Sequence, residues 1–173
     1  MNIKTYDIAD VFTFEKPTFH DDRGFLQEFI NFEVFEKKLN FKFKTNQSLF
    51  SYNKKANTIR GLHYQVAPFE QAKIVSSVKG SVLDIIVDLR ESSKTYMKSL
   101  AFELSDENNL CLYIPKGFAH GYQTLEDDVM FNYLVEGNYN PEHAKTMSYK
   151  DARISLPWKA FNTPVIISEK DNI

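Results

Sequence analysis

Apolar and polar residues alternate along the middle of the chain, a pattern with a period of two that predicts β-strands. Residues 81–90 are the clearest case, because Leu83, Ile85, Val87 and Leu89 all fall on one face of an extended segment. Shorter strand-like runs occupy residues 72–78, 100–104, 110–114 and 130–135. The Leu, Ala and Glu residues of 100–104 would equally suit a short helix. Strands at this regular spacing indicate an all-β sandwich or barrel.

One segment near the start of the chain has helical spacing instead. Residues 32–39 place three apolar side chains on one stripe, and Asn31 before them is a suitable N-cap. The pattern after Pro157 is less regular, and we expect at most a short helix over residues 158–162. We find no repeat, linker or low-complexity segment, so the simplest organisation is a single domain over residues 1–173.

The composition agrees with a globular β protein. The 173 residues are 43% hydrophobic and 25% charged, and the 15 Phe and 9 Tyr residues favour sheets and sheet-on-sheet interfaces. The net charge of −2 gives no overall basic field that would attract nucleic acid. A small anionic ligand would instead need a local cluster of Arg and Lys.

The single cysteine and the length of the apolar runs indicate where in the cell the protein is expected. The single Cys111 rules out an internal disulfide, and its apolar neighbours predict an inert, buried thiol. That usage fits a reducing compartment. The first residues have no apolar core of signal-peptide length, and no apolar run approaches a membrane span. We therefore expect a soluble, cytoplasmic protein with no membrane association.

Four histidines are candidates for chemistry: His20, His63, His120 and His143. His63 lies in a strand-like run, and His120 lies where two Gly residues bracket an apolar turn. Two interpretations stand for this pair. Either they are half-buried imidazoles satisfied by backbone carbonyls, or both face a common cavity of a β-barrel. In such a cavity a neutral imidazole can act as a base near neutral pH.

A metal site is the alternative for a barrel of this kind. Barrels of the cupin type commonly bind a metal through His-x-His, a carboxylate and a further His. Here the second His of that pattern is Gln65, a poor metal ligand, and no Glu follows at the required spacing. We therefore predict neither a metal nor any other cofactor.

Six segments, in order and spacing, resemble the dTDP-4-dehydrorhamnose 3,5-epimerase family: residues 22–28 (DRGFLQE), 58–65 (TIRGLHYQ), 71–73 (QAK), 84–90 (DIIVDLR), 114–121 (IPKGFAHG) and 168–171 (SEKD). They extend over nearly the whole chain, and the combination is specific. The resemblance implies an all-β fold, a cupin-type jelly-roll barrel with a few short peripheral helices. It also implies a metal-independent homodimer that acts on nucleotide-linked 4-keto-6-deoxy sugars.

The resemblance implies a mechanism that suits these residue types. The His matching His63 removes a proton from the carbon beside the ketone, and a carboxylate matching Asp171 holds that imidazole. The Lys matching Lys73 supplies positive charge near the enolate oxygen. The Tyr matching Tyr133 returns a proton from the opposite face. Without the motifs, Lys73 would simply flank a strand, Tyr133 would be a core aromatic and Asp171 a surface residue.

Five further residues match family positions that bind the substrate: Arg23, Glu28, Gln47, Arg60 and His120. Arg suits a diphosphate because its fork of donors makes bidentate contacts. In the family, the residues matching Arg23 and Glu28 are contributed across the dimer. The residue matching Gln47 contacts the nucleotide, and the one matching His120 lines the sugar pocket. Outside such motifs, the two Arg would be solvated surface charges.

Three departures from the family pattern lie where the nucleotide is expected. Leu49 replaces an Asn, Asn138 replaces one of two consecutive Tyr residues, and Leu134 replaces the Lys that follows the Tyr133 position. The loss of a polar group and an aromatic ring weakens the argument for thymidine. A GDP-linked 4-keto hexose or heptose is therefore an alternative to a dTDP-linked 4-keto-6-deoxyhexose.

The sequence thus predicts an isomerase that epimerises C3 and/or C5 of a nucleotide-linked 4-keto sugar, in the biosynthesis of deoxysugars and cell-surface polysaccharides. Two alternatives stay open. A non-catalytic jelly roll that binds sugar nucleotides would keep Arg23 and Arg60 but lose His63 or Tyr133, whereas all four are present. A 3,4-ketoisomerase on the same fold would share the enolate chemistry.

Overall fold

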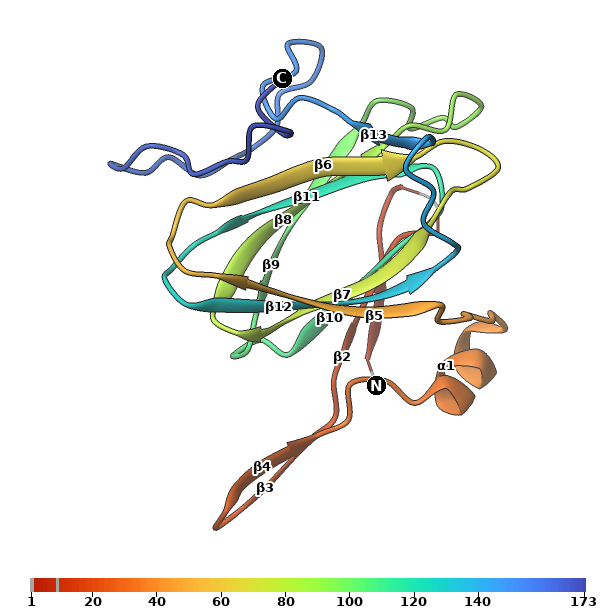
Figure 1. Ribbon diagram of the computed structural model, residues 1–173. Coiled ribbons are helices and arrows are strands. Elements are labelled where there is room, and N and C mark those ends of the chain that lie inside the picture. Colours follow the sequence, from red (N-terminus) through yellow and green to blue (C-terminus); the bar gives the residue numbers. More distant parts are fainter. Residues whose placement is uncertain (1, 9) are drawn as a thin grey trace.

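Two β-sheets face each other in the computed structural model, which describes residues 2–8 and 10–173 (Figure 1). The six-stranded sheet contains, in spatial order, β1 Ile3–Thr5, β2 Phe12–Glu15, β10 Leu110–Ile114, β7 Ala72–Lys79, β12 Val129–Glu136 and β5 Gln47–Asn53. The five-stranded sheet contains β13 Ala144–Thr146, β6 Ile59–Gln65, β11 Phe118–Thr124, β8 Ser81–Asp88 and β9 Ser99–Ser105. Neighbouring strands are antiparallel. The arrangement confirms the predicted all-β jelly roll.

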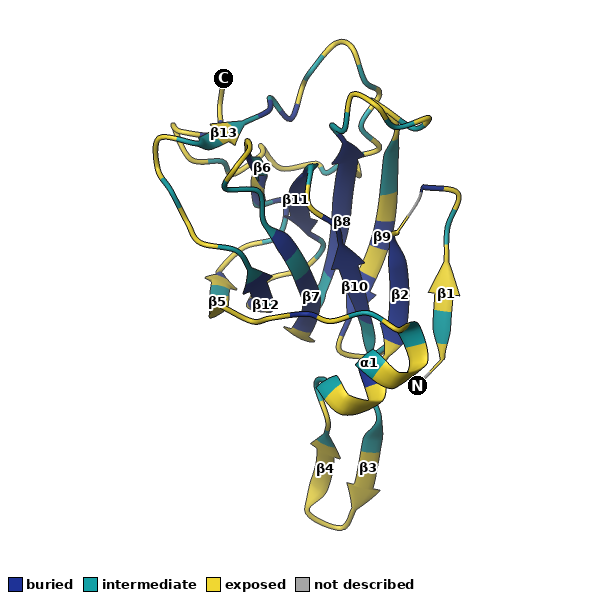
Figure 2. Cartoon of the chain, turned by 90° about the vertical axis from the view of Figure 1, so that its right-hand side faces the viewer, coloured by how far each residue is buried: buried dark blue, intermediate teal, exposed yellow. Residues whose placement is uncertain are grey.

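A hairpin of β3 Thr18–Asp21 and β4 Gly24–Gln27 projects from this body (Figure 1). Figure 2 shows that both of its strands are largely exposed. Phe25 and Leu26 are 66% and 72% exposed, although both are large and apolar. An isolated two-stranded hairpin buries little of its own surface, so these side chains form an exposed apolar patch.

All five strands expected from the alternating pattern are present, as β7, β8, β9, β10 and β12. Residues 100–104 belong to β9 and are not helical, because the whole of β9 pairs with β8. The segment around His120 is also a strand and not a turn, since β11 pairs with β8 on one side and β6 on the other. Its sequence hides it, because Gly121 and the buried polar residues His120 and Gln123 interrupt the apolar, β-branched pattern that marks β8.

The predicted helix is confirmed as α1 Phe32–Leu39. The Asn31 side chain caps it by accepting a hydrogen bond from the Val34 amide at 3.3 Å. Phe35 is fully buried and packs against Phe12 and Phe14 on the outer face of the six-stranded sheet. The helix therefore covers that face.

The expected short helix over residues 158–162 is wrong. Pro157 precedes a segment whose backbone groups bond to a buried side chain instead of to one another. The Lys159 amide donates to the Gln123 side chain at 2.9 Å, and the Lys159 carbonyl accepts from the same amide group at 2.9 Å. The Trp158 indole is held by the Tyr149 carbonyl at 2.8 Å. Among the described residues, α1 is the one α-helix, and it is not long or apolar enough to cross a membrane.

Cys111 confirms the expectation of an inert thiol. Its side chain lies in the cluster between α1 and the six-stranded sheet and has no exposed surface. Burial raises the pKa of the thiol to about 12, so the reactive thiolate does not form near neutral pH.

Two glycines allow β6 and β11 to approach closely. Gly61 has φ +114°, a conformation that L side chains rarely adopt, and an added Cβ would lie 2.6 Å from the Gly121 Cα. An added Cβ at Gly121 would lie 2.8 Å from the Arg60 carbonyl oxygen. The glycines of the RGLH and AHG motifs are therefore required by packing between the strands that carry His63 and His120.

A buried carboxylate anchors the end of β8. Asp88 is fully buried and accepts hydrogen bonds from Arg90 at 2.9 Å and from the hydroxyls of Ser93 and Thr95 at 2.7 Å each. Burial by itself raises the pKa of Asp88, but the hydrogen bonds outweigh it and lower that pKa well below its usual range. Asp88 therefore stays ionised and fixes the loop that follows β8.

We predict that Asp88→Ala lowers the free energy of unfolding by about 3 kcal/mol, because Arg90 and two hydroxyls lose their buried acceptor. Denaturant titration measures this. The folded-state pKa of Asp88 is depressed, so its contribution is complete above the unfolded pKa of about 4 and is lost as the pH falls further. The difference in the free energy of unfolding between the unmodified protein and Asp88→Ala should therefore become smaller in acid.

Asp151→Ala is the matched control, since Asp151 pairs with Arg153 in the same Asp-x-Arg arrangement at an exposed guanidinium. It should change the unfolding midpoint very little. Equal losses in the two variants would contradict the prediction.

Candidate active site

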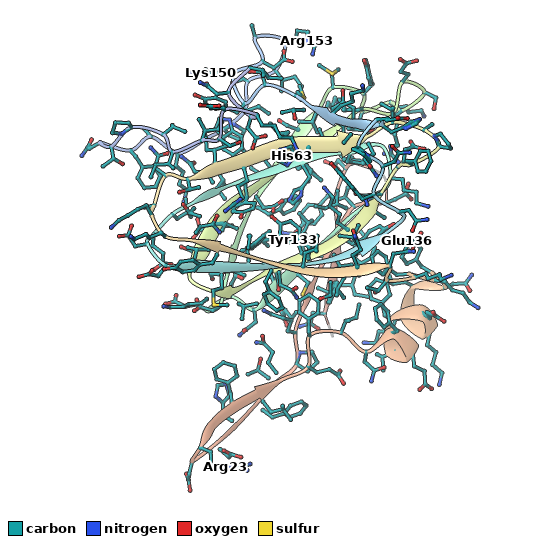
Figure 3. The ribbon with its side chains drawn as sticks, viewed as in Figure 1. Arg23, His63, Tyr133, Glu136, Lys150 and Arg153 are labelled. Carbon is teal, nitrogen blue, oxygen red and sulfur yellow. The ribbon has the colours of Figure 1, made fainter. Side chains whose placement is uncertain are left out.

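A cavity of about 400 Å³ opens between the two sheets. Side chains from β5 and β12 on one sheet, and from β6 and β11 on the other, reach it. Its lining contains seven of the nine predicted site residues: Gln47, Arg60, His63, Lys73, His120, Tyr133 and Asp171. Figure 3 shows His63 and Tyr133 on opposing sheets across the interior. The second interpretation of the two histidines is therefore the right one: both face a common cavity.

His63 pairs with a carboxylate from a distant segment. Its Nε2 lies 2.6 Å from Asp171 Oδ1, and Asp171 is only 4% exposed. The second carboxylate oxygen accepts a hydrogen bond from the Gly61 amide at 3.3 Å. An imidazole held this way has a fixed orientation, and the ring nitrogen remote from Asp171 is left to act on a ligand.

His120 forms a second pair, deeper in the protein. Its Nε2 lies 2.8 Å from Asp84 Oδ2, and both side chains are almost fully buried. Burial lowers the pKa of His120, although the Asp84 charge opposes this effect. His120 is therefore a neutral donor or acceptor at the cavity wall. The Oδ1 oxygen of Asp84 has no hydrogen-bond partner among the described residues.

Lys73 supplies positive charge to the cavity. Burial lowers the pKa of its ammonium group to about 8, and the nearby Asp84 carboxylate works against this by favouring the charged form. Lys73 is thus mostly charged at neutral pH but close to its titration point. A half-buried cation of this kind interacts strongly with negative charge that develops beside it.

Tyr133 lies on β12, and His120 faces its ring edge-on with centroids 6.0 Å apart. Burial raises the pKa of its phenol well above the ordinary value. The group therefore stays protonated and is a proton donor, on the sheet opposite His63.

Arg60 and Gln47 stand at the mouth of the cavity. The Arg60 guanidinium is oriented by a bond from Nε to Asn53 Oδ1 at 2.7 Å. A neighbouring hollow of about 160 Å³ shares His63 and Lys73 with the cavity and adds Lys145 and Lys170. Cationic side chains thus gather around the entrance, although the net charge of the chain is negative.

Arg23 and Glu28 are not brought to this cavity within one chain. Arg23 lies at the tip of the projecting hairpin, with 90% of its side chain exposed and paired to Asp21 (Figure 3). Glu28 follows the hairpin and lies beside Asn31 at the start of α1. The geometry of a single subunit gives these two residues no contact with His63 or Tyr133.

Sequence reasoning did not single out several residues of the lining: Phe50, Ser51, Gln71, Tyr122 and Tyr139. Gln71 was quoted only as part of a motif. Ser51 and Tyr122 carry hydroxyl groups next to Tyr133, but a lone Ser or Tyr in a strand gives no chemical signal. Only the pairing of strands from two sheets brings these groups together.

The departures from the family pattern have different consequences. Leu134 packs in the cluster beneath α1, on the face of β12 opposite Tyr133, so it does not reach the cavity. Asn138 bonds to Asn46 at 3.2 Å, while its neighbour Tyr139 lines the cavity with 55% of its surface exposed. An aromatic ring is thus still present at the entrance. Leu49 alone replaces a polar group in the lining.

Gln65 has a structural role at the position where a metal-binding cupin would carry a His. Its amide nitrogen donates to the carbonyls of Phe69 and Asn138 at 2.6 and 3.0 Å, and its oxygen accepts from the Asn140 amide at 2.7 Å. It joins the two loops beside the cavity. No three His, Cys, Asp or Glu side chains of residues 2–8 and 10–173 are grouped as metal ligands would be.

Comparison with known proteins gives this arrangement a family. The sequence matches the family model described as dTDP-4-dehydrorhamnose 3,5-epimerase over residues 5–173. The chain belongs to the dTDP-4-dehydrorhamnose 3,5-epimerase family. It is 39% identical to the enzyme of that name from Shigella flexneri, over 99% of this chain and 93% of the relative. Membership in this epimerase family makes the protein an isomerase.

Solved structures of the dTDP-4-dehydrorhamnose 3,5-epimerase family share the fold. The Bacillus anthracis enzyme, solved with TDP and PPi bound, is 35% identical with a TM-score of 0.93, covering 99% of this chain and 97% of that one. The Legionella pneumophila enzyme, in complex with dTDP-4-keto-L-rhamnose, is 34% identical with a TM-score of 0.92, covering 98% and 89%.

We predict that the Lys73 ammonium titrates with a midpoint of about 8, and that Asp84→Asn lowers this midpoint. The substitution removes the negative charge that favours the protonated amine. The ¹³Cε resonance of Lys73, followed against pH by NMR, measures the change. Lys55, whose pKa is raised by Asp127, is an internal reference that stays charged. A midpoint that is unchanged or higher in Asp84→Asn would show that Asp84 does not act on Lys73.

Proposed function

We propose that this protein epimerises C3 and/or C5 of a nucleotide-linked 4-keto sugar through an enolate. The observation that carries the proposal is the His63–Asp171 pair at 2.6 Å, set across one cavity from the Tyr133 phenol. Inversion of a carbon needs a base on one face and an acid on the other. These two groups come from opposing sheets and meet that requirement.

His63 acts as the base in this proposal. It takes the proton from the carbon next to the ketone, and Asp171 stabilises the imidazolium that results. Asp171 is buried and also accepts a hydrogen bond from the Gly61 amide, so its carboxylate is fixed in position and holds the His63 ring. The electron pair of the broken C–H bond moves to the carbonyl oxygen and gives an enolate.

Lys73 stabilises that enolate oxygen. It is a half-buried cation in the same lining, and its effect is large because the cavity wall limits the water around it. His120 lines the sugar portion of the cavity beside it. Tyr133 then gives its phenolic proton to the carbon from the face opposite His63, and the inverted ketone forms again.

The nucleotide diphosphate occupies the mouth of the cavity. Arg60 and Gln47 bind it in this proposal, and Lys145 and Lys170 add positive charge alongside. A dTDP-linked 4-keto-6-deoxy sugar is favoured over a GDP-linked sugar, because the Shigella, Bacillus and Legionella relatives all carry dTDP or TDP in their names or complexes. Tyr139 at the entrance provides an aromatic surface for the base.

A homodimer completes the site in this proposal. The exposed apolar patch on the β3–β4 hairpin and the unpaired edge of β5, with Phe50 63% exposed, are surfaces that a second copy would cover. A partner's hairpin over the cavity would bring Arg23 and Glu28 to the diphosphate. A cytoplasmic location also stays a prediction, supported by the free Cys111.

The alternatives receive less support. A binding protein would need neither the buried Asp171 behind His63 nor the proton donor Tyr133, and both groups are in place. A ketoisomerase shares the enolate, but it moves the carbonyl from C4 to C3 by adding a proton to C4. That reaction inverts neither C3 nor C5, so it does not require an acid on the sheet opposite His63.

Incubation with a dTDP-linked 4-keto-6-deoxy sugar in D₂O tests the function. We expect deuterium at C3, C5 or both, counted by NMR and mass spectrometry, together with the inverted products. His63→Ala should reduce exchange at least about 10²-fold, because general-base catalysis contributes that much or more. Tyr133→Phe should keep exchange and lose inversion.

The same assay separates the other candidates. Exchange with a GDP-linked sugar but not the dTDP-linked one would overturn the nucleotide assignment, and a 3-keto product would favour the ketoisomerase. No exchange in the unmodified protein with either nucleotide would overturn the epimerase proposal.

A subunit-mixing experiment tests the shared site. Arg23→Ala and His63→Ala should each be inactive alone. In heterodimers, the intact His63 of one subunit meets the intact Arg23 of the other, so refolding an equal mixture should restore about a quarter of the activity by random pairing. If Arg23 served its own subunit, the mixture would stay inactive, since neither chain has both residues.

A further inference from the structure

The phenol of Tyr122 lies next to that of Tyr133. Tyr122 on β11 is 1% exposed, and its ring lies 6.4 Å from that of Tyr133, measured between centroids. Phe131 packs against both rings, at 4.6 Å from Tyr122 and edge-on at 5.2 Å from Tyr133. The two tyrosines thus form one packed unit that spans the two sheets. The mechanism above uses only one of them.

The Tyr122 hydroxyl is the centre of a hydrogen-bonded chain. It lies 2.7 Å from the Ser51 hydroxyl on β5 and donates to Asn53 Oδ1 at 3.2 Å. Asn53 Oδ1 also accepts from Arg60 Nε at 2.7 Å. Because Tyr122 gives its single proton to Asn53, its oxygen is left to accept from a neighbouring hydroxyl. The hydroxyls of Ser51 and Tyr133 are the neighbours that can donate to it.

We propose that Tyr122 and Ser51 are positioning residues for the Tyr133 acid. Tyr122 holds the neutral phenol in place as an acceptor, and Ser51 donates to the phenolate that remains after proton transfer. The proposal rests on the proposed epimerase function, and it assigns roles to two residues outside the acid–base pair.

Proton transfer from Tyr133 leaves a negative charge on its oxygen, and a hydrogen-bond donor beside that oxygen stabilises the charge. When the Tyr133 O–H bond breaks, the enolate electron pair forms the new C–H bond, and the negative charge ends on the phenolic oxygen. Solvent water restores that proton after product release. Burial opposes a phenolate at Tyr133, and the Ser51 hydroxyl is the neighbour that lowers the pKa of the phenol. A hydroxyl donor at this position therefore stabilises the charged state of the acid when it forms.

The partition between inversion and exchange tests the proposal. His63 removes the proton in either case, so deuterium exchange reports on the base, whereas inversion reports on delivery from Tyr133. We expect Ser51→Ala and Tyr122→Phe each to lower the ratio of inversion to exchange by about tenfold or more, while exchange stays near its normal rate. Tyr133→Phe defines the lower limit of the ratio. Ser51→Thr, which keeps the hydroxyl, should restore it.

Tyr6→Phe is the matched control, because it removes a partly buried hydroxyl 2.9 Å from Thr13 Oγ1, outside the cavity. It should leave the ratio unchanged. A normal ratio in both Ser51→Ala and Tyr122→Phe would overturn the inference, as would equal losses of exchange and inversion, which indicate general damage. Absence of exchange in the unmodified protein would instead count against the epimerase function, so the two failures are distinguishable.

Discussion

The close pairing of β6 with β11 is the constraint on which the rest of the site depends. It sets His63 opposite His120 in register, so that two imidazoles share one wall of the cavity. The approach is possible because Gly61 and Gly121 have no side chains at the contact. Any Cβ there would separate the strands, and the two histidines would lose their common orientation. The motif glycines are thus required by strand packing, and through that packing they place His63 and His120 at the cavity.

Burial of charge gives that wall its chemistry. An unpaired ionised group in the interior is very unfavourable, so each imidazole is matched to a carboxylate, Asp171 for His63 and Asp84 for His120. The two pairs differ in exposure. The His63 side chain is 41% exposed and can meet a ligand, whereas His120 is sealed at 3%. The same His–Asp pairing in two environments therefore gives one pair that a ligand can reach and one buried pair whose Asp84 carboxylate acts on Lys73.

Much of this could be read from the sequence, and the limits have physical reasons. Period-two alternation gave β8 and its neighbours, and the spacing of apolar residues gave α1 with its Asn31 cap. Strand β11 was missed because it carries Gly121 and the buried polar residues His120 and Gln123 where β8 carries β-branched apolar residues. The motifs named the residues of the cavity but not Tyr122 or Ser51, whose importance arises from contact between sheets. The helix expected over residues 158–162 failed because Gln123, distant in sequence, takes the backbone bonds there.

The segment after β13 shows how such distant contacts deliver a functional group. Ile166 bridges to Thr58 beside β6, and it exchanges backbone hydrogen bonds at 2.9 and 3.0 Å with Ile59 and Asn57. A turn at Ser168, closed by the Asp171 amide at 3.0 Å, then aims the carboxylate at His63. Backbone hydrogen bonds attach this segment to the start of β6. They do not depend on side-chain identity, so the local sequence does not predict the attachment. The orientation of the His63 ring therefore depends on how this segment packs against β6. Weakening these backbone bonds would disturb the His63–Asp171 pair before it disturbed the core.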